Sequence, residues 1–127
     1  MVNLKNPLKV NLSRRLQALT KFILPGKPVA DIGSDHAYLP LYLIKEDLVP
    51  FVIATELTQG PWQKAKNLIE FHQLREKIDL RLGDGLHPLK KGEVSTVVIA
   101  GMGAKTIIHI LESNLDLLSS VERLVLQ

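Results

Sequence analysis

Residues 29–40 read VADIGSDHAYLP, an apolar strand-like run that enters a glycine turn and continues into a helical pattern. A strand, a turn and a helix in this order open the parallel α/β folds that bind nucleotides. In a dinucleotide fingerprint, glycines stand at the three positions occupied here by Gly33, Asp35 and Tyr38. A carboxylate at position 35 would repel a pyrophosphate, and Tyr38 would block close packing of the helix on the strand. The turn therefore disfavours NAD and FAD.

The rest of the chain repeats this alternation of strand and helix. Apolar runs suited to buried strands cover residues 28–33, 51–57, 78–83, 94–102 and 123–127. Helical patterns cover 37–47, 61–74 and 103–111, with a short turn at 86–89. We predict an α/β fold, a Rossmann-like doubly wound parallel sheet, with its ligand site outside the carboxyl ends of the strands. A further helix is expected over 11–25, capped near Ser13 and stopped by Pro25 and Gly26.

Composition limits the class of protein. The 127 residues suffice for one domain with a core, and the sequence contains no cysteine, which excludes disulfides, thiolate metal sites and cysteine nucleophiles. No apolar run approaches the roughly 18 residues of a membrane span, and no signal peptide opens the chain. We expect a cytoplasmic protein. The net charge is +3, and a basic segment precedes the first acidic residue, Asp31; it contains Lys5, Lys9, Arg14, Arg15, Lys21 and Lys27. Such a segment is either a phosphate-binding surface or a solvated helix face.

Acidic residues close three of the predicted strands. Glu56 lies a little over 20 residues beyond the glycine turn, where a carboxylate can accept both ribose hydroxyls of an adenosine, or it is simply an exposed strand-end acid. Asp84, in the triplet Gly-Asp-Gly, can reach an adenine amine or can be an ordinary turn aspartate. Asp31 likewise has two possible roles: it can attract a ligand, or it can only stabilise the turn by accepting backbone N–H hydrogen bonds.

These acids favour a cationic nucleoside over a phosphate. S-adenosylmethionine carries no phosphate, and both its sulfonium and its ammonium are positive, so that Asp31 and Asp35 would attract it. His36 can contact cofactor or substrate, or it can be structural. We expect no metal, because no second histidine accompanies Asp31, Asp35 and His36 on the same element.

Several stretches together resemble one family. They are LSRRL, ADIGSDHAYLP, GPWQKAK, GDGL, VVIAGMGA and LVLQ, spread over residues 11–127. The chain is similar to the bacterial tRNA (adenine(22)-N1)-methyltransferases, the TrmK family. The resemblance implies a class I methyltransferase fold and methyl transfer from S-adenosylmethionine to N1 of an adenine in tRNA.

The resemblance also implies a set of site residues. It assigns cofactor contacts to the turn after the first strand, to the end of the second and to the Gly-Asp-Gly triplet. With adjacent residues, the expected cofactor site is Asp31, Gly33, Ser34, Asp35, His36, Glu56, Leu57, Asp84 and Gly85. The target base is expected beside Ala100, Gly101 and Met102, and the backbone carbonyls of Ala100 and Gly101 can accept from its amine. Asp35 is the candidate acid that contacts either the base or the methionine ammonium.

Two departures from the family pattern limit this expectation. The family usually reads GMGG where this chain has Met102, Gly103 and Ala104. Family members also continue beyond LVLQ into further strands and a helical segment that helps to hold tRNA, so we expect a fragment truncated after its fifth strand. Two alternatives stay open: a small-molecule methyltransferase, and a non-catalytic module that binds S-adenosylmethionine or RNA.

RNA contacts are predicted mainly on the first helix. Arg14 and Arg15 are candidates to bind tRNA phosphates, with an affinity that falls as salt rises. Tyr38 and Trp62 are the aromatic residues considered for stacking on a flipped adenine, although Trp62 can equally pack within its own helix.

Overall fold

The computed structural model describes residues 2–3 and 6–127, so Lys5 of the basic segment lies outside the described residues. Five parallel strands form one sheet in the order β5-β4-β3-β6-β7. Their bounds are β3 Val29–Ile32, β4 Val52–Glu56, β5 Ile78–Leu82, β6 Thr96–Ile99 and β7 Arg123–Leu126. The predicted doubly wound parallel sheet is confirmed, and each strand lies within its predicted run.

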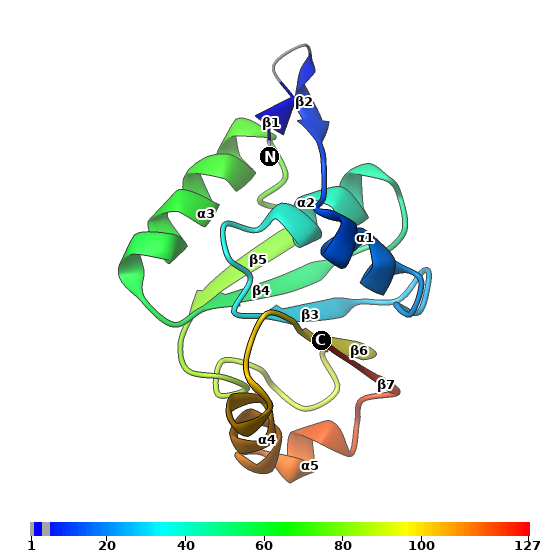
Figure 1. Ribbon diagram of the computed structural model, residues 1–127, viewed down its shortest axis with the longest axis vertical. Helices are drawn as coiled ribbons and strands as arrows, with labels where there is room; N and C mark the ends of the chain where they lie inside the picture. The colour runs from blue at the N-terminus through cyan, green and yellow to red at the C-terminus, as the bar shows by residue number, and fades with distance from the viewer. Residues whose placement is uncertain (1, 4–5) are drawn as a thin grey trace.

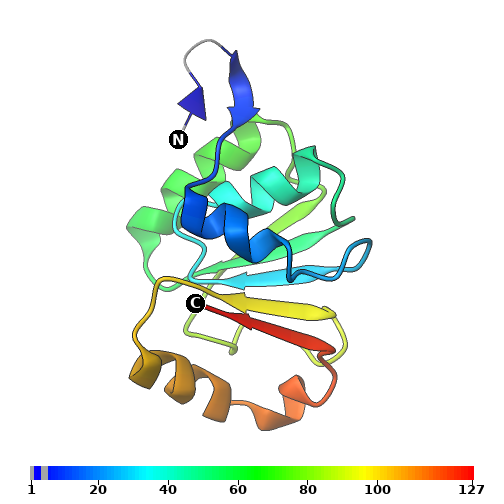
Figure 2. The same ribbon diagram turned by 45° about the vertical axis from the view of Figure 1, so that its right-hand side comes forward.

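Helices cover both faces of this sheet (Figures 1 and 2). The helices α1 Arg14–Thr20, α2 Tyr38–Lys45 and α3 Gln59–Phe71 lie on one face. The helices α4 Ala104–Glu112 and α5 Leu115–Leu118 lie on the other. Every residue of the three central strands β3, β4 and β6 is buried, as expected for strands covered on both sides.

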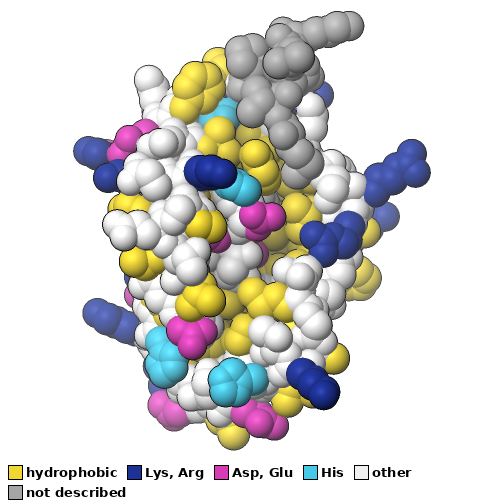
Figure 3. Space-filling view, turned by 60° about the vertical axis from the view of Figure 1, so that its left-hand side comes forward, with side chains coloured by type: hydrophobic (Ala, Val, Ile, Leu, Met, Phe, Trp, Pro, Cys, Tyr) yellow, Lys and Arg dark blue, Asp and Glu magenta, His cyan; other side chains and the backbone are white. Residues whose placement is uncertain are grey.

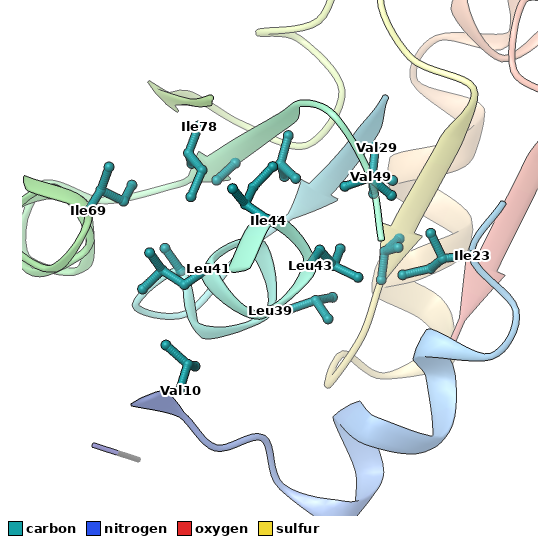
Figure 4. Packing of buried hydrophobic residues seen from close by; sticks show 14 of the residues in the cluster. Val10, Ile23, Val29, Leu39, Leu41, Leu43, Ile44, Val49, Ile69 and Ile78 are labelled. Carbon is teal, nitrogen blue, oxygen red and sulfur yellow. The ribbon is translucent and has the colours of Figure 1, made fainter. Parts of the chain in front are cut away.

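Alternate residues of each central strand enter two different cores. Val29 and Val98 join the core beneath α1, α2 and α3, whereas Ala30 and Val97 join the core beneath α4 and α5. Figure 4 shows the first core, in which side chains of α2 such as Leu41 point between the sheet and the neighbouring helices. The period of two places the side chain of Asp31 on the same face of the sheet as Val29. Asp31 thus lies on the face that α1 and α2 cover.

The first helix is shorter than the predicted 11–25. Ser13 caps it as expected, since its Oγ accepts from the backbone N–H of Leu16 at 3.3 Å. After Thr20 the chain continues in tighter turns, in which Ile23 N–H donates to the carbonyl of Thr20. These turns leave Phe22 61% exposed.

Three elements were not predicted from the sequence: β1, β2 and α5. An antiparallel pair, β1 Val2–Asn3 and β2 Asn6–Val10, precedes α1, and Figure 1 shows it at the top of the view, above α2. Val10 at its end is buried and joins the core beside α2. The short helix α5 follows α4, where Asn114 Oδ1 accepts from Leu117 N–H at 3.1 Å. The turn predicted at 86–89 is present, with both of its leucines, Leu86 and Leu89, buried.

Parallel register brings the strand ends to one edge of the sheet. Asp31 pairs with Ala54 of β4, and Ile32 pairs with Ile99 of β6. The turn after β3 therefore lies between the end of β4 and the turn after β6. Figure 3 looks onto this side, where acidic and histidine side chains border a hollow that also carries hydrophobic side chains.

Candidate functional site

The turn after β3 has an unusual backbone. Gly33 adopts a left-handed φ of +66°, and it is followed by three non-glycine residues in the same region, Asp35, His36 and Ala37, with φ of 50°, 69° and 64°. Each left-handed residue with a side chain costs about 1–2 kcal/mol. A strained turn of this kind persists only where surrounding contacts hold it, and such turns cluster at ligand sites.

The end of β4 supplies those contacts. Gly33 N–H donates to Thr55 Oγ1 at 3.1 Å, and Ser34 N–H donates to the carbonyl of Thr55 at 2.9 Å. Asp35 N–H donates to Glu56 Oε1 at 2.7 Å. Three successive amide donors of the turn are thus satisfied within the protein, whereas a phosphate-binding turn directs its amides at the ligand.

Acidic side chains surround the same turn. Asp31 is 4% exposed, and one of its oxygens, Oδ2, accepts from Ser34 Oγ at 2.9 Å. Burial raises the pKa of Asp31 to about 7, and the negative charges of Glu56 and Asp35 add to the rise against the opposing Ser34 hydrogen bond. Burial also raises the pKa of Glu56, which is 3% exposed and therefore not the exposed strand-end acid of the alternative interpretation. A positive ligand would relieve this accumulation of carboxylates.

Asp35 and His36 lie at the rim of the site. The Asp35 side chain is 85% exposed, and its Oδ1 lies 3.0 Å from His36 Nδ1. The His36 ring in turn lies 5.8 Å from the ring of Tyr38, the first residue of α2. The rim therefore presents a carboxylate, an imidazole and a phenol to an approaching ligand.

A pocket of about 260 Å³ opens beside the turn. It lies between α1, the end of β3, the start of α2 and the turn after β6. Of the predicted cofactor and base residues, it brings together Asp31, Gly33, Ser34, Asp35, Ala100, Gly101 and Met102. Its remaining lining residues are Arg15, Leu16 and Leu39.

Close approach of backbone and side chains shapes two walls of this pocket. A Cβ on Gly33 would collide with the methyl group of Met102, so glycine allows that side chain to cover the turn. Gly101, with φ of +79°, faces Arg15, and a Cβ there would lie 3.1 Å from Arg15 Nη1. The left-handed φ values favour glycine at both positions, and its lack of a side chain lets Met102 and Arg15 approach the backbone closely.

The remaining predicted cofactor residues lie outside the pocket lining. Glu56 and Leu57 close β4, and the carbonyl of Glu56 accepts from Gly83 N–H at 2.9 Å, which fixes the start of the turn containing Asp84 and Gly85. Leu57 is 64% exposed and Asp84 is also exposed. The ends of β4 and β5, with Leu57 and Asp84, thus form an exposed surface beside the turn after β3, which we call the open shelf.

Two residues considered for RNA are placed apart from the pocket. Arg14 is exposed on α1 and does not line it. Trp62 lies in a separate groove with Phe51 and Leu80, and Lys66 Nζ lies 5.3 Å from the centre of its ring. The interpretation that Trp62 packs on its own helix agrees with this position.

The sequence analysis missed four residues that shape the site. Thr55 was not predicted as a site residue because threonine is common in strands. Its position directly before the acidic residue that ends β4 could have indicated a role at the strand end. Leu16 and Leu39 read as ordinary core positions of helices. Arg15 was predicted to bind RNA and not to line the pocket. Its approach to Gly101 depends on how α1 packs on the sheet, and a local sequence pattern does not predict that packing.

Within residues 2–3 and 6–127, no three His, Cys, Asp or Glu side chains are grouped so as to hold a metal ion. The helices of this described part are all too short or too polar to cross a membrane.

Comparison with known proteins identifies the family. A family model described as a methyltransferase domain matches residues 12–127. The chain belongs to this methyltransferase domain family. Its sheet and helices have the Rossmann-like class I methyltransferase fold, in agreement with the expectation from the sequence.

Relatives of this methyltransferase domain include characterised structures. The chain is 47% identical over 119 residues to the tRNA (adenine(22)-N(1))-methyltransferase of Bacillus subtilis (strain 168), covering 94% of this chain and 50% of that protein. The crystal structure of the B. subtilis m1A22 tRNA methyltransferase TrmK superposes with a TM-score of 0.90, at 47% identity, over 93% of this chain and 50% of that one. A Streptococcus pneumoniae protein in complex with S-adenosyl-L-methionine matches with a TM-score of 0.88, at 43% identity, over 91% of this chain and 55% of that one. The chain spans about half the length of the relatives it matches.

Proposed function

We propose that residues 1–127 form an S-adenosylmethionine-binding methyltransferase domain. The observation that carries this proposal is the turn after β3, whose three amide donors bond to Thr55 and Glu56 while the side chains around them are acidic. These three N–H groups are therefore not available to a phosphate, whereas the carboxylates around them can attract a cation. A relative with 43% identity is solved in complex with S-adenosyl-L-methionine, which supports the same ligand here.

The cofactor would lie along the strand ends. Asp31 and Asp35 would face its positive methionine end, inside the pocket with Gly33 and Ser34. Glu56 would accept the ribose hydroxyls through carboxylate lone pairs other than those that accept from the backbone N–H groups of Asp35 and His36. Leu57, Asp84 and Gly85 would border the adenine on the open shelf, and His36 would close the rim.

We propose N1 of adenine 22 in tRNA as the methyl acceptor. Bound S-adenosylmethionine supplies a methyl group activated by a sulfonium. The protein's task is then to align acceptor and donor and to exclude water, because adenine N1 already carries an in-plane lone pair. Backbone carbonyls of Ala100 and Gly101 would accept from the adenine amine and orient the ring, with Met102 beside it. Asp35, exposed at the rim, would contact the base or the methionine ammonium.

The tRNA assignment rests on relatives that carry this name at 47% identity. Arg14 is the α1 residue best placed to bind tRNA phosphates, because it is exposed and lies outside the pocket. Each phosphate contact steepens the fall of affinity with salt by about one unit on a log–log plot. A tRNA substrate would place the activity in the cytoplasm.

Calorimetric titration of the 127-residue chain tests the cofactor. We expect S-adenosylmethionine to bind and NADH not to bind. Binding of NADH with equal affinity, or failure of a folded chain to bind S-adenosylmethionine, would overturn the assignment. The methyl acceptor is tested with radiolabelled S-adenosylmethionine and tRNA transcripts that have adenine or guanine at position 22. Methylation of both transcripts alike would exclude adenine 22 as the target.

A further inference from the structure

Arg15 lines the pocket, and its backbone carbonyl is bonded to the residue that follows β7. Arg15 is the second residue of α1, whose start is capped by Ser13. Its carbonyl accepts from Gln127 Nε2 at 3.2 Å, and the carbonyl of Gln127 accepts from Gly101 N–H at 3.0 Å. The start of α1, the end of β7 and the turn after β6 are therefore joined at this point. The guanidinium lies against Gly101, where a Cβ would approach Arg15 Nη1 to 3.1 Å.

Among residues 2–3 and 6–127, the Arg15 guanidinium has no partner. Among the residues that the structure describes, none makes a hydrogen bond or ion pair with the Arg15 guanidinium. Arg81 provides a contrast, since its guanidinium bonds to Asp79 and to both carboxylate oxygens of Glu93. The N–H donors of the Arg15 guanidinium have no partner among the described residues. A guanidinium in this state can bind a carboxylate or a phosphate through two parallel hydrogen bonds.

The charges in the pocket decide between these two ligands. Asp31 and Asp35 line the same cavity of about 260 Å³ as Arg15. An RNA phosphate drawn into this cavity would meet both carboxylates. An α-amino acid group instead carries an ammonium and a carboxylate on one carbon, and it matches a pocket with acids at the end of β3 and a cation over Gly101. A pocket with the two acids alone would hold the ammonium and repel the carboxylate beside it.

We infer that Arg15 binds the carboxylate of the cofactor's methionine end, opposite the acids that attract its ammonium. This inference rests on the proposed function and deepens it. It moves Arg15 from the RNA surface into the cofactor site and leaves Arg14 as its neighbour on the RNA side. It also gives α1 a role in cofactor selection, because the helix carries the cation that completes the pocket.

Decarboxylated S-adenosylmethionine provides the test, because it keeps the sulfonium and the ammonium but lacks the carboxylate. Calorimetry would compare it with S-adenosylmethionine on the unmodified chain, on Arg15→Gln and on the matched control Arg14→Gln. We expect the unmodified chain to prefer S-adenosylmethionine by about tenfold or more, in line with a charge-assisted pair at a partly exposed site. Arg15→Gln should remove this preference by weakening only the carboxylate-bearing ligand. Arg14→Gln should leave both affinities unchanged.

The possible results distinguish the role of Arg15 from the proposed binding of S-adenosylmethionine. Equal affinity of the unmodified chain for the two ligands would overturn the role of Arg15 without any variant. Equal weakening of both ligands by Arg15→Gln would also overturn it, since the residue would then act through the fold. Unchanged cofactor binding by Arg15→Gln, together with weaker tRNA binding, would return Arg15 to the RNA surface. Failure of the unmodified chain to bind either ligand would overturn the proposed cofactor and the inference together.

Discussion

The backbone N–H of Asp35 donates to Glu56 Oε1 at 2.7 Å, across the gap between the turn after β3 and the end of β4. One carboxylate thereby holds a left-handed residue in place and lies beside the cavity in which we place the cofactor. Because Glu56 is 3% exposed, this bond is shielded from water and is stronger than the same contact at the surface. The strained turn and the proposed ribose site thus depend on the same side chain.

Replacement of Glu56 by alanine is expected to weaken S-adenosylmethionine binding at least about tenfold, since a carboxylate that accepts hydroxyl hydrogen bonds contributes about 1.5–3 kcal/mol. Calorimetric titration measures the loss. Glu56→Gln is the matched control, because it keeps an oxygen for Asp35 N–H but loses the charge. Its affinity for S-adenosylmethionine should lie between those of the unmodified chain and Glu56→Ala. Undiminished binding by Glu56→Ala would show that the ribose lies elsewhere.

Thr55→Val should destabilise the protein by about 1–3 kcal/mol, because it leaves the N–H of Gly33 without its acceptor in a partly buried turn. Valine has nearly the same shape, and Thr55 is 1% exposed, so packing should change little. Urea denaturation followed by circular dichroism gives the difference. Thr55→Ser retains the hydroxyl and should be affected much less. Equal losses for the two variants would point to the missing methyl group rather than to the hydrogen bond.

Cofactor affinity should rise with pH as Asp31 loses its proton. Its pKa of about 7 means that the empty site is partly neutral near pH 7, whereas a cationic ligand prefers the carboxylate. We expect S-adenosylmethionine to bind more tightly at pH 8 than at pH 6, with release of protons detected as a dependence of the binding heat on the buffer. Asp31→Asn should abolish this trend. A pH trend that survives in the variant would have to come from another group.

The same group makes a prediction for stability. Asp31 has a raised pKa in the folded chain, so between about pH 4 and pH 7 the native state binds more protons than the unfolded state. The free energy of unfolding contributed by this group therefore falls as the pH rises through that window, by an amount on the order of a few kcal/mol. Asp31→Asn should be more stable than the parent at pH 8, and the difference should shrink towards pH 4. Constant stability differences across this range would contradict the prediction.

His72 should produce the opposite slope. Burial lowers its pKa below the usual 6.5, with a further contribution from Lys45, whose Nζ lies 3.3 Å from His72 Nδ1. The unfolded state then binds more protons as the pH falls below about 6.5, so stability is lost in that direction. Denaturation at pH 7.5 and pH 5 should show a smaller loss in His72→Gln than in the parent. His109→Gln, an exposed position on α4, serves as the control.

The sequence by itself determined the fold class and the chemical character of the site. Apolar runs alternating with helical patterns are local properties, and they give the parallel sheet because buried strands must be covered by helices on both faces. The replacement of a fingerprint glycine by Asp35 is likewise visible in the chain, and it argues against a pyrophosphate ligand. Asp31, Gly33 and Ser34 line the pocket together because they are neighbours in sequence.

Only the tertiary structure decided which distant residues share that pocket. The sheet order β5-β4-β3-β6-β7 puts β6 beside β3, although β4 and β5 separate them in the chain, and so it brings Ala100 to Asp31. Both Arg14 and Arg15 are exposed, but the packing of α1 places Arg15 beside Gly101 in the pocket lining and Arg14 outside it. The sequence alone does not show this difference between two adjacent arginines. Burial of Asp31 and Glu56 is equally non-local, since a carboxylate at a strand end becomes a perturbed group only when helices cover it. Periodicity is fixed by neighbours along the chain, whereas charge and burial at a site are fixed by neighbours in space.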